Sequence, residues 1–169
     1  MPHPYLSLTD DELVRQCVVE TMRASGPGGQ HRNKTESGVR MRHGPTGVST
    51  QAFERRSQHE NRAVALRRLR ANIAIEWRQA VEVGSFAPGD ELAGILPGAK
   101  GRVGPNNERF WPGIAMLLDL FVALECSVSG TAASLGISTG ALSRLLLDSP
   151  TVGAKVNELR AARGMRALR

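Results

Sequence analysis

A stretch rich in glycine and proline constrains the fold of this chain most, because it interrupts every regular pattern. Residues 84–109 contain six Gly and three Pro in 26 positions. This density of residues with special backbone preferences predicts a linker or an irregular loop. We therefore expect a first domain over residues 1–83 and a second over residues 110–169. The length of 169 residues leaves room for one domain plus a smaller second unit.

The part before this stretch begins with short elements. Residues 9–12, "TDDE", have the form of a capping box and predict a short helix over residues 10–16. Residues 17–24 are rich in β-formers and predict a strand that leads into a loop. Residues 38–43 and 47–53 alternate apolar and polar side chains around a Gly-Pro-Thr-Gly turn, which predicts a β-hairpin.

A long helix is expected after the hairpin. A second capping box, residues 57–60, marks its start, and the helix should run to about residue 82. Its buried stripe recurs every three or four residues, at Leu66, Leu69, Ile73 and Trp77. Strand, loop, hairpin and long helix together predict a small α+β domain.

The part after the linker is apolar and helical. Helices are expected near residues 112–126, 129–135 and 138–147, and a last one from Ser149-Pro150 onward. The spacing between Val128 and Leu147 is that of a helix-turn-helix, with Gly136 where the turn needs a left-handed backbone. The fold class predicted for the chain is α+β, with a helix-turn-helix-like all-α unit at the C-terminal side.

Positive charge is concentrated in one segment. The net charge is +6 and the isoelectric point about 10.3, yet residues 23–70 alone hold eleven cations against three Glu. Of the 22 cations in the chain 19 are Arg, which binds phosphate groups bidentately. The composition therefore favours a polyanionic partner for this segment.

The sequence gives no sign of a disulfide framework, a zinc site or a membrane anchor. Cys17 and Cys126 are far apart in apolar surroundings, so both are expected to be free thiols. The N-terminal residues are acidic, and no apolar run reaches transmembrane length. We expect a monomeric cytoplasmic protein without a cofactor or a metal.

The candidate catalytic residues lie in residues 23–40, "RASGPGGQHRNKTESGVR". Glycines at 26, 28 and 29 let a reacting group approach the backbone N–H of Gln30, a candidate oxyanion donor. The Gln30 amide could also orient a water molecule, whereas His31 is the one neighbour with a pKa suited to general base catalysis.

Three other interpretations of this loop remain open on the residues alone. It could be a plain Gly-rich turn. A phosphate-binding loop is disfavoured because the Gly-Lys-Ser/Thr ending is missing. A nucleophile at Ser25 or Ser37 would need a base and an orienting acid, and neither stands in an obvious arrangement.

Taken with "HGPTGV" and "ERRSQHENRAVAL" downstream, the loop resembles the catalytic domain of class I peptide chain release factors and their ribosome-rescue relatives. The resemblance covers roughly residues 17–80 and rests on Gly-Gly-Gln together with residues 33–34 and 56–59. Only some sixteen residues precede the first strand, so the resemblance is closer to the short codon-independent peptidyl-tRNA hydrolases. Arg32 departs from the aliphatic residue that the family leads us to expect there.

The resemblance implies hydrolysis of the ester between nascent peptide and tRNA on the ribosome. Gly28 and Gly29 would shape the loop, and Gln30 would stabilise developing charge and position water. Family members often carry a methyl group on this glutamine amide, which makes Gln30 a candidate for the same modification. His43 and His59 are expected to be structural.

Ribosomal RNA and peptidyl-tRNA are the implied partners, and an auxiliary protein factor is a further candidate. The candidate RNA contacts are Arg23, Arg32, Asn33, Lys34, Arg40, Arg42, Arg55, Arg56, Arg160, Arg163, Arg166 and Arg169. The helical part expected over residues 110–169 is open to three interpretations: a ribosome-binding module, a packed support for the catalytic domain, or a DNA-binding unit. The alternative function is a non-catalytic regulator that docks on ribosomes or nucleic acid.

Overall fold

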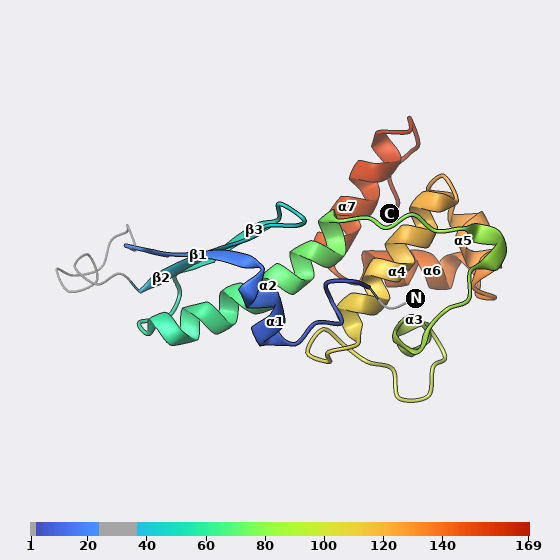
Figure 1. The fold of residues 1–169 in the computed structure, drawn as a ribbon. Helices are drawn as coiled ribbons and strands as arrows, with labels where there is room; N and C mark the ends of the chain where they lie inside the picture. Colours follow the sequence, from blue (N-terminus) through green and yellow to red (C-terminus); the bar gives the residue numbers. More distant parts are fainter. Residues whose placement is uncertain (1–2, 24–36) are drawn as a thin grey trace. The chain divides into compact units, whose positions relative to one another are not determined.

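The computed structural model describes residues 3–23 and 37–169, and within them the chain divides into two compact units. The first, Pro4–Ile73, is called the sheet unit below. The second consists of Ala74–Arg169 together with the N-terminal residues up to His3, and is called the helical unit. Figure 1 shows the course of the chain through both.

The sheet unit contains one antiparallel sheet and two helices. Its sheet has three strands in the order β1-β2-β3. Its elements are α1 (Asp10–Arg15), β1 (Cys17–Met22), β2 (Gly38–His43), β3 (Ser49–Ala52) and α2 (Gln58–Glu76), whose last turn lies past the boundary of the unit. The predicted short helix, strand and hairpin are thus confirmed, as is the capping box of Thr9 and Glu12.

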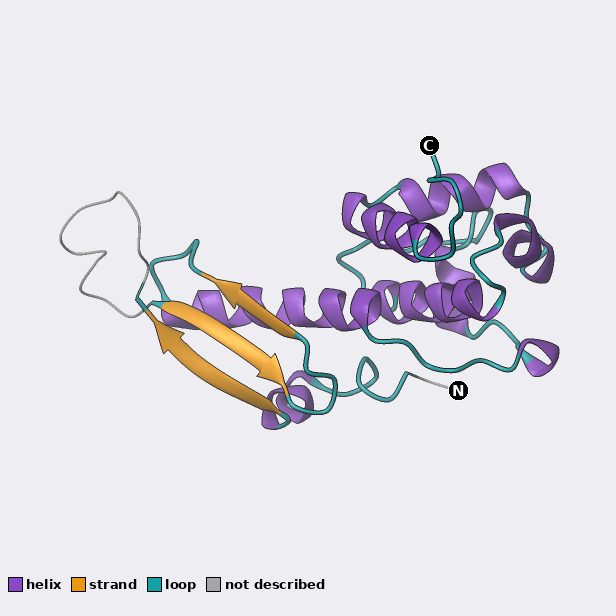
Figure 2. Cartoon of the chain, turned by 90° about the horizontal axis from the view of Figure 1, so that it is seen from above, coloured by secondary structure: helices purple, strands orange, loops and turns teal. Residues whose placement is uncertain are grey.

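The core of the sheet unit lies between α2 and one face of the sheet, and Figure 2 shows the helix running along that face. Val39, Met41 and Ala52 alternate with exposed residues on β2 and β3 and are buried. Leu69 and Ile73 of α2 are buried as well, which confirms these positions of the predicted stripe. The alternation leaves the opposite face of the sheet polar.

Helix α2 ends at Glu76, earlier than the predicted residue 82. The reason lies in the helical unit, where the carboxylate of Asp119 accepts hydrogen bonds from the Gln79 backbone N–H at 3.0 Å and from Arg78 at 2.7 Å. The Arg78 guanidinium also donates to the carbonyls of Ala74 and Ala115. These tertiary contacts replace the next helical hydrogen bonds.

The helical unit contains five α-helices and one short 3₁₀ turn after Glu76. They are η1 (Val83–Ser85), α3 (Asp90–Ile95), α4 (Phe110–Ala123), α5 (Val128–Ser134), α6 (Thr139–Leu147) and α7 (Pro150–Ala161). The four helices predicted after the linker are present within a few residues of their expected limits. Together with the sheet, these helices confirm the predicted α+β class.

The stretch predicted as a linker contributes to the core of the helical unit. Leu92 and Ile95 of α3 are buried and belong to the same apolar cluster as Leu117 and Leu118 of α4. The helices approach so closely that a Cβ on Gly113 would stand 2.5 Å from the Glu91 carbonyl oxygen. The two compact units of the structure divide between Ile73 and Ala74. The domain limits predicted at residues 83 and 110 stay a prediction.

The turns of the helical unit use the left-handed backbone region three times in a short distance. Gly136, between α5 and α6, has φ +66°, as the helix-turn-helix spacing predicts. Glu125 and Cys126, between α4 and α5, have φ of 53° and 56°, which costs energy for residues with a side chain. The Arg160 guanidinium donates to the Cys126 carbonyl at 2.7 Å and helps to hold this turn.

Both cysteines are free thiols, as predicted, with Cys126 buried and Cys17 half-buried. Among residues 3–23 and 37–169, no helix is long and apolar enough to cross a membrane.

Candidate active site and nucleic-acid interface

The candidate catalytic loop joins the paired ends of β1 and β2. Its residues Gly28, Gly29 and Gln30 lie outside the described part of the chain, as do Arg32, Asn33 and Lys34. The described stems are in register, with Met22 of β1 opposite Gly38 of β2. The two ends of the loop therefore leave the sheet side by side.

One buried amide holds the C-terminal stem of the loop. Asn61 of α2 is completely buried and donates hydrogen bonds to the carbonyl oxygens of Ser37 at 2.6 Å and Arg55 at 2.8 Å. Its own Oδ1 accepts from the Arg55 backbone N–H at 2.9 Å. Ser37, which follows the loop, is thereby tied to the chain that enters α2.

Close packing also fixes this stem. A Cβ on Gly38 would stand 2.4 Å from the Phe53 ring and 2.9 Å from the Met22 carbonyl oxygen, so only glycine fits. Neither Asn61 nor Gly38 was among the residues selected from the sequence. A polar residue within the otherwise apolar face of a predicted helix was the available signal for Asn61.

His43 is a structural residue at the other end of the sheet. Its imidazole is buried between Thr46, whose hydroxyl lies 2.9 Å from Nδ1, and Gln16, whose Oε1 lies 3.0 Å from Nε2. The amide oxygen can only accept, so Nε2 carries the proton and Nδ1 accepts from the hydroxyl. Burial lowers the pKa of His43, which keeps the ring neutral at pH 7.

The exposed face of the sheet carries two of the candidate RNA contacts. Arg40 and Arg42 project from β2 on the face away from α2, opposite Glu20 and Val18 of β1. Arg40 approaches Glu20 at 3.9 Å, a long and solvent-exposed ion pair that contributes little to stability. This face is therefore open, polar and basic.

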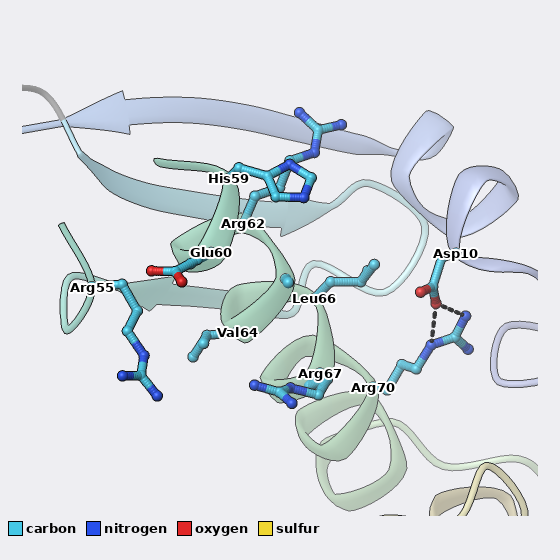
Figure 3. A pocket seen from close by; sticks show the side chains of 10 residues that line it. Asp10, Arg55, His59, Glu60, Arg62, Val64, Leu66, Arg67 and Arg70 are labelled. Carbon is cyan, nitrogen blue, oxygen red and sulfur yellow. Dashed lines mark hydrogen bonds and ion pairs between the residues drawn. The ribbon is translucent and has the colours of Figure 1, made fainter. Parts of the chain in front are cut away.

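A second cationic surface is an open groove along α2, with a volume of about 580 Å³ (Figure 3). It lies within the sheet unit and is lined by Asp10, Arg55, His59, Glu60, Arg62, Ala63, Val64, Leu66, Arg67 and Arg70. Arg70 is engaged, because its guanidinium pairs with Asp10 at 2.7 Å and donates to the carbonyls of Leu6 and Leu8. His59, expected to be structural, is exposed here.

The free cations of this unit share one property. Their guanidinium groups are exposed and, within the described residues, make no hydrogen bond or ion pair; they are Arg15, Arg42, Arg55, Arg56, Arg62 and Arg67. Arg62 and Arg67 were not among the residues we selected from the sequence. Arg23, at the end of β1, is exposed beside the loop.

The C-terminal arginines of the helical unit are of two kinds. Arg160 donates to the carbonyls of Cys126 and Arg166, and Arg163 pairs with Glu125 at 3.1 Å. Arg166 and Arg169 are exposed and line a second pocket. Reciprocal hydrogen bonds between Asn157 and the backbone of Leu168 fold the last residues back onto α7.

Comparison with known proteins finds matches over part of this chain. Residues 11–84 match the RF-1 domain. Over 69 residues the chain is 51% identical to peptide chain release factor 1 of Acidiphilium cryptum (strain JF-5), which covers 41% of this chain and 20% of the relative.

Two further relatives give the same result. Peptide chain release factor 1 of Dictyoglomus thermophilum is 54% identical over 71 residues, 41% of this chain and 19% of the relative. Peptide chain release factor 2 of Paramagnetospirillum magneticum (strain AMB-1) is 45% identical over 95 residues, 55% of this chain and 26% of the relative.

Residues 11–84 form a release-factor-like GGQ domain. The resemblance that the sequence motifs indicated is thus confirmed for this segment. The chain spans about a quarter or less of the length of these three relatives. The GGQ domain includes β1 to β3, nearly all of α1, and the whole of α2, and so contains both basic surfaces of the sheet unit.

Across the described ranges, no three His, Cys, Asp or Glu side chains gather in a way that could hold a metal ion.

Proposed function

We propose that this protein hydrolyses the ester bond of peptidyl-tRNA on the ribosome. The observation that carries the proposal is the identity of about half of all positions to release factors across the segment that contains Gly28, Gly29 and Gln30. The backbone N–H of Gln30 would stabilise the developing oxyanion, and its side chain would position the attacking water. Stems held by strand pairing and by Asn61 would present this loop at a fixed position.

We further propose that release does not depend on a codon. On α6, the second helix of the helix-turn-helix-like pair, the exposed side chains are Thr139 and Arg144 beside Gly140. Discrimination among bases needs a preorganised set of donors and acceptors, which this surface does not offer. The protein would act in the cytoplasm as a monomer and rescue stalled ribosomes.

The test measures peptide release from ribosomes programmed with truncated, sense-codon and stop-codon messages, with no added factor. We expect release on all three, fastest on the truncated message, and a strong loss in Gln30→Ala, because alanine keeps the backbone N–H but removes the side-chain amide that would position the attacking water. Thermal unfolding of Gln30→Ala should match that of the wild-type chain. A preference for stop codons of roughly a hundredfold would overturn codon-independence.

The alternative function is a non-catalytic regulator that docks on ribosomes. Equal ribosome binding by wild type and Gln30→Ala, with no peptide release by either, would favour this alternative. Mass spectrometry of the purified protein would show whether the Gln30 amide carries a methyl group.

A further inference from the structure

The described residues that line the groove along α2 belong to α1, to α2 and to the segment that leads into α2. Seven of its ten lining residues are charged or histidine, and the three apolar ones are Ala63, Val64 and Leu66. Pockets that bind small organic molecules are lined mainly by apolar and aromatic side chains. The composition of the groove therefore points to a charged ligand.

The charge of the groove is positive after its internal pair is set aside. Asp10 and Arg70 neutralise each other at one end, and Figure 3 shows this pair apart from Arg55 and Glu60 at the other end. The remaining charged residues of the groove are then three arginines, Arg55, Arg62 and Arg67, and one acid, Glu60. Since these guanidiniums have no partner within the described residues, an anion can reach them without breaking an existing ion pair.

The arrangement suits an extended anion better than a single phosphate. Arg62 and Arg67 are five residues apart on one helix, which separates them by about 7.5 Å along its axis and by about 140° around it. Because the two side chains point to different sides of the helix, a single phosphate cannot contact both, whereas an extended chain of phosphates can. Arginine is also the cation that grips phosphate bidentately, and the groove contains no lysine.

We propose that this groove is a docking site for an RNA sugar-phosphate backbone, with Arg62 and Arg67 as its principal contacts. The choice of RNA rests on the proposed function. The groove would bind the RNA and would contribute affinity without contributing to the chemical step. Glu60 would limit that affinity through repulsion of the phosphates.

The experiment uses the full chain and two probes, a fluorescein-labelled single-stranded RNA of mixed sequence and purified ribosomes. Affinity is measured from 50 to 200 mM salt for wild type, Arg62→Gln, Arg67→Gln and the double variant. Arg15→Gln is the matched control, because Arg15 is an exposed arginine of the same unit outside the groove. Glutamine retains a good helix propensity, and circular dichroism verifies folding.

We expect the double variant to bind both probes at least roughly tenfold more weakly at 50 mM salt. Its slope of log affinity against log salt on the single-stranded RNA should fall by about 1.4, or about 0.7 for each lost phosphate contact. Arg15→Gln should stay near wild type, and Glu60→Gln should bind more tightly. Equal affinities for wild type and the double variant, or equal losses in Arg15→Gln, would overturn the proposal.

Release kinetics separate this inference from the proposed function. At limiting protein concentration the double variant should release peptide more slowly than wild type, in proportion to its loss of affinity. If wild type releases no peptide while RNA affinity still depends on Arg62 and Arg67, the docking site stands and the proposed hydrolysis fails. If release is robust and affinity is unaffected by both substitutions, the hydrolysis stands and the docking site fails.

Discussion

The sheet unit contains several arginines without a partner among the described residues, although its Arg68 and Arg70 are paired, whereas many cations of the helical unit are bonded within the fold. In the helical unit Arg78, Lys155 and Arg160 bind carboxylates or carbonyls of the same unit. In the sheet unit Arg42 and Arg62 stand exposed without such partners among the described residues. The same residue type therefore supports the fold in one unit and remains available to a ligand in the other.

The difference follows from the acids near each cation. Residues 4–73, the sheet unit, hold twelve cations and seven acids, whereas residues 74–169 hold ten cations and nine acids. Where acids are abundant, tertiary folding can pair the charges. Where they are scarce, the excess charge must face solvent or an anionic partner, since an unpaired buried charge is very costly.

The strongest test of this comparison removes the buried carboxylate of the helical unit. Asp119→Ala leaves the Arg78 charge without its carboxylate partner, so we expect a loss of about 3–5 kcal/mol in the free energy of unfolding. Both tryptophans, Trp77 and Trp111, lie in the helical unit, so their fluorescence in a urea titration reports its unfolding selectively.

The matched control is Asp148→Ala, which removes an exposed carboxylate 3.3 Å from Arg102. Surface pairs of this kind contribute about 0–1 kcal/mol, so the control should unfold close to wild type. If both substitutions destabilise the unit equally, burial does not distinguish structural cations from surface ones and the comparison fails.

A second prediction concerns the sheet unit, where the neutral amide of Asn61 bonds to buried backbone groups. Asn61→Ala removes the partner of the Ser37 and Arg55 backbone groups, and we expect a loss of about 1–3 kcal/mol. Far-UV circular dichroism should detect an earlier transition, while tryptophan fluorescence should change less. Peptide release should also fall, because the loop stem loses its attachment to α2.

Asn61→Asp serves as the companion variant, since it retains the acceptor that receives the Arg55 N–H but loses the donor to Ser37. Release that drops in both variants even at temperatures where both are folded would identify Asn61 as a positioning residue. Wild-type release from a folded Asn61→Ala chain would limit its role to stability.

The smallest predicted effect is a pair of opposing pH dependences in the helical unit. Burial raises the pKa of Asp119 to about 6 despite the attraction of Arg78, and burial lowers the pKa of His3 to about 4, helped by the charge of Arg78. Between about pH 4 and 6 the folded state binds more protons at Asp119 than the unfolded state does. The contribution of Asp119 to the free energy of unfolding therefore falls as pH rises.

His3 acts in the opposite direction over nearly the same range. The unfolded chain binds extra proton at His3 between about pH 4 and 6.5, so this contribution to stability rises with pH. We expect the urea midpoint of wild type to change little from pH 4.5 to 6.5. In Asp119→Asn it should rise with pH, and in His3→Leu it should fall; two slopes of the same sign would contradict the assignment.

Local sequence signals determined much of the fold, because they arise from interactions within a few residues. The capping box at Thr9, the hairpin turn before β3 and the left-handed Gly136 each depend on local backbone chemistry. The release-factor-like loop could likewise be recognised from its residues alone. The predictions for Gly28, Gly29 and Gln30 depend on the sequence in the same way.

Only the tertiary structure decided where α2 ends, which residue holds the loop stem and which arginines remain free. The end of α2 depends on Asp119, some forty residues further along the chain, and Asn61 bonds to Ser37 across 24 residues. Arg160 and Arg166 look alike in the sequence, yet one is bonded to Cys126 and the other is exposed. Contacts between distant residues depend on how helices and strands pack, and no local pattern encodes the partner of a side chain.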